Sequence, residues 1–481
     1  VDTIPQRLSN FSSNISSLSA WMLNLKNQPL EIDYLRIQSE DVAVPKANAG
    51  FFQTLSYMAK QFAGSFVMDY NSIGDTTAAA EALDVWIGLG RDQVQIIKEL
   101  VDENFTAKTG IPVNIKLAKD SMIQATFAGR GPDIALFIAQ DQPVNLAVRG
   151  ALVNLSQFPD FEEAAAEFSP ESFVPYSYEN GVYGMPLTGS FQMLFCRTDI
   201  LEELGLKAPE TWRDLYEMIP VIQQKNMNVG LPKVVIDATG AGSGTSAMFD
   251  TLLLQKGLNY FDDSRSSTNF DKPEALEAFR EWTDFYTKYK VSKKLNHLTY
   301  FRTGETPIVF MPYTFYANLQ AAAPEIKGQW SMLPVPGTVQ EDGSIDHSTV
   351  ATVTGSVILS KSEHVDASWE YLKWWSSRDV QQEYGSNLES VVGAAARYNS
   401  ANIEAMNLVQ WDYDIKDSLN RQLEWIKAYP EVPGGYLTTR YYDFAFRDIV
   451  YSDKKVRETM IDAVEHIDSE IAHKREEYNL D

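Results

Sequence analysis

Short apolar segments alternate with amphipathic segments from residue 83 onward, and this alternation limits the possible folds more than any other feature. Residues 83–90 (LDVWIGLG) predict a strand that ends in glycines, and residues 94–110 predict an amphipathic helix that ends at a glycine. Residues 111–118 and 131–139 predict two more strands. Strands separated by helices in this way favour an α/β sheet whose strands run largely parallel.

The chain is too long for a single core and too acidic for a nucleic-acid partner. Its 481 residues predict two or three domains or lobes, and 44% hydrophobic residues are typical of a folded protein. No apolar run approaches the roughly 18 residues of a membrane span. The net charge of −24 repels phosphate backbones. The single cysteine, Cys196, excludes an internal disulfide and a thiolate metal cluster, and we expect no cofactor.

The first eighty residues differ from the rest because they predict helices alone. Apolar side chains within 8–25 and within 52–66 recur at steps of three or four. We expect a helical extension packed on the main body, with a separate functional module as the alternative. Residues 71–82 (NSIGDTTAAAEA) predict a linker. The chain begins at Val1 without a signal-like segment, so either a targeting peptide was removed or the chain is an excised piece of something larger.

Helices and strands continue to alternate in the second half of the chain. Thr211 predicts the N-cap of a helix within 208–225, and Asp271 with Pro273 predicts the start of another within 271–289. The other expected elements are strands at 306–317 and 350–360 and helices at 364–377 and 456–478.

Six segments, in this order, resemble one protein family. They are DVWIGLGRDQVQIIKELVDENFTAKTGIPVNIK (84–116), GPDIALF (131–137), YGMPLTGSFQMLFCRTDIL (183–201) with APETWRDL (208–215), FRTGETPIVFMPYTFYANL (301–319), WSMLPVPG (330–337) and VTGSVILSKSEHVDASWEYLKWWSS (353–377). Over about residues 83–478 the chain resembles extracellular solute-binding proteins of carbohydrate ABC importers, the group that includes maltose-binding protein. Two features depart from the family pattern: the N-terminal helices, and Cys196 where an aromatic residue followed by Asn is common.

The resemblance implies a particular α/β fold. This is the two-lobed periplasmic-binding-protein-like fold (type II), in which the chain crosses between the lobes on hinge strands and the lobes close on a solute. The N-terminal helices would be an extension of it. The implied organisation is a helical extension and linker at 1–82, lobe one at 83–186 plus 353–392, a hinge crossing at 337–352, and lobe two at 187–336 plus 393–481.

A polar interruption in the apolar run at 183–201 is the leading candidate for the binding site. Thr188, Gly189, Ser190 and Gln192 stand where a simple buried strand would stay apolar. Sugar binding needs aromatic faces against C–H surfaces and polar side chains for the ring hydroxyls. We therefore expect Thr188, Ser190 and Gln192 to contact ligand, with a polar strand edge as the alternative.

Four further candidates follow the first and third strands. In open α/β sheets, ligands lie beyond the carboxyl ends of the strands. Arg91 and Asp92 follow the first strand, although Asp92 as a helix cap is the alternative. Gln140 and Asp141 follow the third strand. Ser243 lies in a glycine-rich loop, and because GAGSG is no dinucleotide or phosphate-binding fingerprint, a flexible loop is its alternative.

The remaining candidates come from late segments. Tyr313 and Phe315 stand where the family often offers a stacking aromatic, and an alternating strand would place them on one face, with core packing as the alternative. In VPGGYLTTRYYD (432–443) the candidates are Gly435, Tyr436, Arg440 and Tyr441. Arg440 would grip a hydroxyl pair or a carboxylate, or else form a surface ion pair.

The resemblance implies a receptor outside the cell. It would capture a carbohydrate, in particular an oligosaccharide, and deliver it to the permease subunits of an ABC transporter. We expect a monomer that is periplasmic or anchored as a lipoprotein, with no metal and no enzymatic activity, because the histidines lack metal-ligand spacing and GSG lacks the nucleophile-elbow pattern. The alternatives are a sensory or non-sugar binding protein for an anionic solute or peptide, and a glycan-cleaving enzyme.

Overall fold

The computed structural model describes residues 50–64, 71–74, 81–118, 125–126, 128–232, 247–293 and 296–480. The helix expected within 8–25 and the loop with Ser243 lie outside these residues. None of the helices in the described ranges is both long and apolar enough to cross a membrane.

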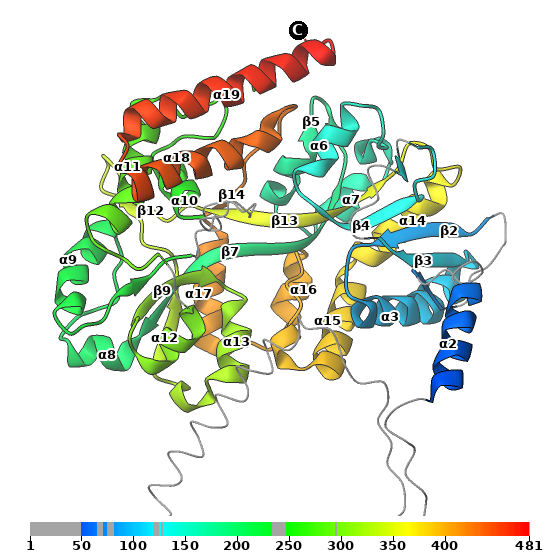
Figure 1. Ribbon diagram of the computed structural model, residues 1–481, viewed down its shortest axis with the longest axis horizontal. Coiled ribbons are helices and arrows are strands. Elements are labelled where there is room, and N and C mark those ends of the chain that lie inside the picture. The colour runs from blue at the N-terminus through cyan, green and yellow to red at the C-terminus, as the bar shows by residue number, and fades with distance from the viewer. Residues whose placement is uncertain are drawn as a thin grey trace, which may run out of the picture.

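One ten-stranded sheet runs through the described structure (Figure 1). Its strand order is β1-β3-β2-β4-β13-β7-β9-β8, with β10 added beside β7 and β14 beside β13. The parallel pairing of β2 with β3 and with β4 confirms the strand direction expected for the first three strands. The strands are β1 Ser72–Ile73, β2 Leu83–Ile87, β3 Val113–Leu117, β4 Ile134–Ala139, β7 Met185–Arg197, β8 Val229–Gly230, β9 Ile308–Pro312, β10 Trp330–Leu333, β13 Thr349–Ile358 and β14 Ile426–Lys427. Two small ribbons stand apart: β5 Ser177–Tyr178 with β6 Gly181–Val182, and β11 Thr338–Val339 with β12 Ile345–Asp346.

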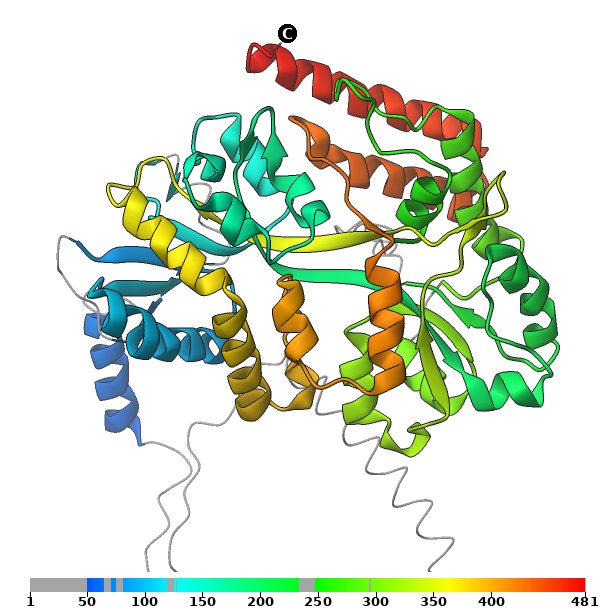
Figure 2. The same ribbon diagram turned by 180° about the vertical axis from the view of Figure 1, so that it is seen from behind.

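Two long strands join the two ends of this sheet. The first half of β7 pairs with β13, and its second half pairs with β9 and β10. The strand β13 pairs with β4 on its other edge. Figures 1 and 2 show β7 and β13 crossing the middle of the molecule between a lobe that contains β2–β4 and a lobe that contains β9. The exact residue boundaries expected for the lobes and the hinge crossing stay predictions.

Helices cover both faces of the sheet and bury separate cores. One core packs Ile97 and Phe105 against Trp375, and another packs Phe249 and Phe446 against Trp282. Each lobe therefore holds a core of its own. Burying one large apolar side chain in such a core contributes roughly 1.5–3 kcal/mol of stability. The helices are α2 Phe51–Gly64, α3 Arg91–Leu100, α4 Ala107–Thr109, α6 Gln142–Ala147, α7 Phe161–Ala165, α8 Thr198–Glu203, α9 Trp212–Gln223, α10 Ala247–Gln255, α11 Pro273–Thr287, α12 His297–Thr303, α13 Phe315–Ala322, α14 Val365–Ser376, α15 Arg378–Val392, α16 Ile403–Leu408, α17 Tyr413–Leu423, α18 Thr438–Ser452 and α19 Val456–Glu477. Short helical turns are η1 Val101–Thr106, η2 Leu155–Gln157, η3 Pro170–Tyr176, η4 Pro324–Ile326, η5 Ala394–Ala396 and η6 Gly435–Leu437.

Local signals located several helix starts. The Thr211 hydroxyl accepts from the backbone N–H of Asp214, and the Asp214 carboxylate accepts from the backbone N–H of Thr211, which confirms the expected N-cap. Pro273 occupies the first turn of α11, whose N-cap is Lys272, so the helix starts within the expected segment.

The expected strand at 306–317 extends five residues beyond the C-terminal end of the observed strand. Strand β9 ends at Pro312, and the chain enters α13 at Phe315. The Tyr313 N–H still donates to the Phe191 carbonyl, 3.0 Å away, and the Phe315 ring packs edge-on against Phe195 at 5.1 Å. Burial of both rings in the core therefore decides the backbone path here, and Tyr313 and Phe315 do not share the face of a strand.

The apolar face of α2 is exposed. The helix expected within 52–66 forms, but Leu55, Met58 and Phe62 are 54%, 60% and 70% exposed. The expectation that these three side chains pack on the main body was therefore wrong. Periodicity predicts which face of a helix is apolar, but it contains no information about the partner surface.

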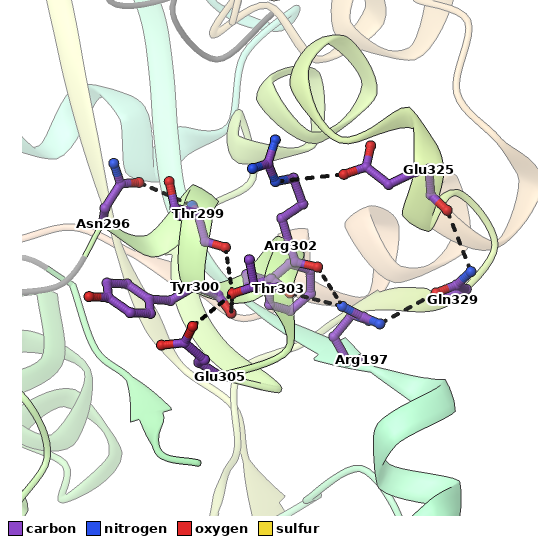
Figure 3. Close-up of polar contacts among 10 residues, drawn as sticks. Arg197, Asn296, Thr299, Tyr300, Arg302, Thr303, Glu305, Glu325 and Gln329 are labelled. Atoms are coloured by element: carbon purple, nitrogen blue, oxygen red, sulfur yellow. Dashed lines mark hydrogen bonds and ion pairs between the residues drawn. The ribbon is translucent and has the colours of Figure 1, made fainter. Parts of the chain in front are cut away.

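A buried arginine closes the end of β7 (Figure 3). Arg197 is 6% exposed, and its Nη1 donates to the carbonyls of Phe301 and Arg302 at the C-terminus of α12, both at 3.0 Å. Its Nε and Nη2 donate to the Asp199 carboxylate at 2.9 and 2.7 Å, and Nη2 also reaches Gln329 Oε1 at 3.4 Å. One guanidinium thus caps a helix and ties it to the segment before β10.

Candidate ligand-binding site

A pocket of about 320 Å³ lies on one face of β13, between the two lobes. Figure 1 shows α6 and α18 on the same side of β13, and the pocket is lined from both directions. The lining residues are Ala139, Gln140 and Asp141 after β4; Val350, Thr352, Val353 and Thr354 on β13; Tyr260 and Phe261; Tyr429, Pro430 and Glu431; and Gly435, Tyr436, Thr438 and Thr439 at the start of α18. Its size is at the lower end of the roughly 300–1,000 Å³ range of small-molecule sites.

Sheet register brings the first group of expected site residues together. Ala139 on β4 stands opposite Thr354 on β13, and Thr354 stands opposite Thr188 on β7. The hydroxyl oxygens of Thr188 and Thr354 are 2.6 Å apart, so they share a hydrogen bond. Ser190 stands opposite Thr352, which also lines the pocket. Cross-strand partners share a face of the sheet, so Thr188 and Ser190 lie beside the pocket lining.

Gln192 is placed one step further along β7. Its backbone partner is Pro312 on β9, and its Oε1 is buried without a hydrogen-bond partner among the described residues. Leu194 and Cys196, two and four residues later, point into the lobe-two core. The alternation of a strand therefore gives Gln192 the same face as Thr188 and Ser190.

Gln140 and Asp141 line the pocket, as their position after β4 led us to expect. The Gln140 Oε1 accepts from the backbone N–H of Val353 at 3.1 Å, which fixes the side chain across the end of β13. Burial raises the pKa of Asp141 above its usual range. The Gln140 amide lies near Glu431, which lines the pocket from the 429–431 segment, and it lowers the pKa of that carboxyl.

Glu431 is the second carboxyl of the pocket. Burial raises its pKa to about 8, the negative charge of Asp141 adds to that rise, and the nearby Gln140 amide opposes it. At neutral pH the neutral form of Glu431 is therefore favoured. The negative charge of Asp141 disfavours ionisation of Glu431, so the state in which both carboxyls are ionised is disfavoured.

Two stacked tyrosines form the aromatic wall. The rings of Tyr260 and Tyr429 lie 3.8 Å apart at 16°. The Tyr429 hydroxyl donates to the Asp250 carbonyl at 2.8 Å, and the Tyr260 hydroxyl donates to the Asp250 carboxylate. These bonds fix both rings, which are each 5% exposed and form an apolar edge of the pocket together with Phe261.

A buried acid supports this wall from behind. Asp250 is fully buried, and burial raises its pKa to about 8 although the bond from Tyr260 lowers it; the nearby Asp443 raises it further. Burial raises the pKa of Asp443 to about 7. Asp250 therefore favours the neutral form at neutral pH, and Asp443 favours it only below neutral pH.

The late candidates divide into two pairs. Gly435 and Tyr436 line the pocket, and the Tyr436 hydroxyl donates to Glu470. Arg440 is exposed with its guanidinium 5.6 Å from the Phe444 ring, and Tyr441 stacks on His466 at 4.9 Å; neither lines the pocket. Thr438 and Thr439 line it instead.

Four candidates lie away from the pocket. Arg91 and Asp92 are exposed at the start of α3. The helix cap offered as the alternative for Asp92 is made instead by Gln93, whose Oε1 accepts from the backbone N–H of Gly90 at 3.2 Å. Tyr313 and Phe315 are each 2% exposed in a core on the other face of β7, where the Tyr313 ring lies 4.7 Å from Phe191.

Sequence reasoning missed the aromatic wall and the second carboxyl. Tyr260 and Tyr429 come from loops, where no periodicity marks a side chain as facing a site. Tyr429 and Glu431 lie in the three residues directly before the VPGG turn. Extending the candidate segment 432–443 by three residues would have included both. Gly434 in this turn has φ 85°, and a Cβ there would lie 2.9 Å from the backbone of α19, so only glycine fits.

The described residues contain no group of three or more His, Cys, Asp or Glu side chains placed to hold a metal ion. The pocket instead offers amide, hydroxyl and carboxyl groups beside aromatic rings. Such a lining binds and orients a polar solute by hydrogen bonds and stacking.

Comparisons with known proteins agree with this architecture. The chain is 19% identical over 299 residues to the maltotriose-binding protein of Pyrococcus abyssi, covering 61% of this chain and 62% of that protein. It is 23% identical over 329 residues to the lactose-binding protein of Rhizobium radiobacter, covering 63% and 72%. The structure of the sugar-binding protein MalE from Xanthomonas citri superposes with a TM-score of 0.67 at 19% identity, covering 83% of this chain and all of that one.

This likeness confirms the two-lobed type II periplasmic-binding fold. Residues 90–382, more than half of the chain, match the family model of bacterial extracellular solute-binding proteins. That segment begins directly before α3, includes β4, β7 and β13, and ends within α15. The chain belongs to the family of bacterial extracellular solute-binding proteins.

Proposed function

We propose that this protein captures a carbohydrate, in particular an oligosaccharide, in the pocket between its lobes and delivers it to the permease of an ABC transporter. One observation carries the proposal. The stacked rings of Tyr260 and Tyr429 stand beside Gln140, Asp141 and Glu431, so a single pocket offers an aromatic face and hydrogen-bonding groups. The names of the maltotriose-, lactose- and other sugar-binding relatives support the same class of ligand.

Closure of the lobes would couple binding to delivery. The pocket takes residues from the end of β4 on one side and from 429–439 on the other, so a ligand touching both sides favours the closed form. The permease would then recognise that form. Under this proposal the lobes are 83–186 plus 353–392 and 187–336 plus 393–481, joined at 337–352.

The proposal includes the location, the oligomeric state and the partners of the protein. The protein would act outside the cell, periplasmic or anchored as a lipoprotein, as a monomer without enzymatic activity and without a nucleic-acid partner. Its net charge of −24 supports the last point.

Thermal unfolding in the presence of candidate solutes tests the proposal. A ligand that binds only the folded protein stabilises it through mass action and so raises its melting temperature. At a ligand concentration of a hundred times the Kd, the free energy of unfolding increases by about 2.7 kcal/mol. The panel contains mono- and oligosaccharides, amino acids, peptides and polyanions, each incubated long enough to detect product. Stabilisation by a saccharide without product supports the proposal. Stabilisation by charged non-sugar solutes alone contradicts it, and product formation identifies a glycan-cleaving enzyme.

The variant Gln140→Ala locates the site. Gln140 lines the pocket and accepts a hydrogen bond from the backbone of β13, so its loss should weaken saccharide binding. Gln340→Ala is the matched control, because Gln340 makes comparable backbone contacts at 3.2 Å outside the pocket lining. Equal affinities of the two variants would place the site elsewhere.

A further inference from the structure

The charge of the pocket lining points to the chemistry of its ligand. Among the described lining residues, the ionisable groups other than tyrosines are Asp141 and Glu431, and Lys, Arg and His do not occur there. The two carboxyls come from opposite walls, one after β4 and the other before η6. A neutral sugar site can use carboxylates, but their charge then needs a positive partner or free access to water.

The described lining residues supply no positive partner for this pair, and both side chains are only partly exposed. Burial raises the pKa of both Asp141 and Glu431, and the charge of Asp141 raises that of Glu431. Glu431 also raises the pKa of the buried Tyr176, which stands behind the pocket. Gln140 opposes the rise in the pKa of Glu431 but carries no charge. The site is therefore short of positive charge.

Nearby cations are engaged elsewhere. Lys427 lies 3.5 Å from the Glu171 carboxylate, and Arg265 donates to the Ser177 carbonyl at 3.4 Å. Arg440 lies over the Phe444 ring. These contacts leave the pair Asp141 and Glu431 to be neutralised by protons or by the ligand.

A second observation points to a hydrogen-bonding ligand. Thr438 lines the pocket and is 2% exposed, yet its hydroxyl has no hydrogen-bond partner within the described structure. A buried hydroxyl without a partner costs roughly 1–3 kcal/mol. A ring hydroxyl of a bound sugar would satisfy it.

We propose that the pocket binds an amino-substituted saccharide, with its protonated amine between the carboxylates of Asp141 and Glu431 and a ring hydroxyl near Thr438. This inference rests on the proposed function and names the substrate class. The ammonium group supplies the missing charge and draws the opposite walls together. In the free protein the two carboxyls resist closure when both are ionised, so the ligand's charge also favours the closed lobes.

Proton release accompanies this mode of binding. Because the pKa of Glu431 is raised to about 8, its carboxyl favours the protonated form at pH 7, whereas a bound ammonium would favour the ionised form of both carboxyls. The bound state therefore keeps the ligand's proton on its nitrogen and releases the carboxyl proton to solvent. A neutral sugar provides no charge that would drive this release.

Isothermal titration calorimetry with matched saccharides tests the inference. The β-1,4-linked glucosamine trimer is compared with its N-acetylated form and with cellotriose, and kanamycin A is compared with maltotriose; spermidine and calcium chloride test the bare cations. Titrations at pH 7 in buffers of different ionisation enthalpy measure the protons released. We expect an amine-bearing saccharide to bind at least tenfold more tightly than its neutral counterpart and to release a proton.

Variants connect that preference to the two carboxyls. Glu431→Gln and Asp141→Asn keep the side-chain shape and should remove both the amine preference and the proton release. Glu465→Gln, on the exposed face of α19, is the control and should behave as wild type. Circular dichroism and the melting temperature verify that each variant is folded.

The outcomes separate this inference from the proposed function. Equal or tighter binding of the neutral saccharides overturns the inference and leaves carbohydrate capture in place. Binding of spermidine or calcium with no saccharide contradicts both, and so does a panel without any binding. An amine preference that survives in both carboxyl variants also overturns the inference.

Discussion

The hydroxyls of Thr188 and Thr354 form a 2.6 Å hydrogen bond between β7 and β13, the two strands that pass from one lobe to the other. Thr354 also lines the pocket, so this bond connects the crossing strands to the site. Replacing Thr188 with Val keeps the shape of the side chain and removes its hydroxyl. A hydrogen bond of this kind contributes about 0.5–1.5 kcal/mol.

We therefore expect Thr188→Val to lower ligand affinity several-fold while the melting temperature of the free protein falls by only a few degrees. Calorimetric titration and thermal unfolding measure the two effects. The double variant Thr188→Ala with Gln192→Ala should weaken binding further, since Gln192 shares the same face of β7. Unchanged affinity in the double variant would show that this face of β7 does not support the site.

Tyr436 offers a test that hardly disturbs the fold. Its side chain is 41% exposed and lines the pocket, so Tyr436→Ala should reduce affinity by about 0.5–1.5 kcal/mol with little loss of stability. Tyr441→Ala is the matched control, because Tyr441 stacks on His466 outside the pocket lining. Titration of both variants with the same saccharide gives the comparison, and an equal loss in both would remove Tyr436 from the site.

The buried Asp250 predicts a pH dependence of stability. Its pKa is raised to about 8 in the folded protein, whereas an unfolded Asp titrates near 4. The unfolded state therefore releases its proton first as pH rises, and the stability that neutral Asp250 contributes is present below pH 4 and lost as pH rises through 8. Asp250→Asn should flatten the fall in melting temperature between pH 5 and pH 8. A variant that keeps the full wild-type slope would contradict this role.

Arg197 predicts a stability effect separate from binding. Its buried guanidinium holds two carbonyls of α12 and the Asp199 carboxylate, so Arg197→Ala should cost about 3–5 kcal/mol of unfolding free energy. Arg213→Ala should cost less than about 1 kcal/mol, because the Arg213–Glu217 ion pair is exposed. Urea unfolding measures both. Similar losses in the two variants would refute the structural role of Arg197.

The parts of the fold that local pattern controls were predictable from sequence. The parallel arrangement of β2 with β3 and β4 followed from alternating strands and helices, and Thr211 located a helix start by its own side-chain chemistry. Tertiary contacts controlled the rest. Phe315 enters a helix because its ring is buried against Phe195, and no periodic signal contains that information.

The candidate site shows the same division. Gln140 and Asp141 were predictable because the end of a parallel strand fixes where the next residues lie. Tyr260, Tyr429 and Glu431 were missed because they reach the pocket from loops that only the folded chain brings together. Arg440 was selected for its chemistry, yet its position on α18 turns it toward Phe444.

The central claim is that a saccharide binds between Gln140 and Glu431. Its most direct test is calorimetric titration of the most stabilising saccharide into wild type and into Glu431→Ala, with folding verified by circular dichroism. The account predicts one site in the wild type and at least a tenfold loss of affinity, about 1.4 kcal/mol, in the variant. Equal affinity in the two proteins would contradict it.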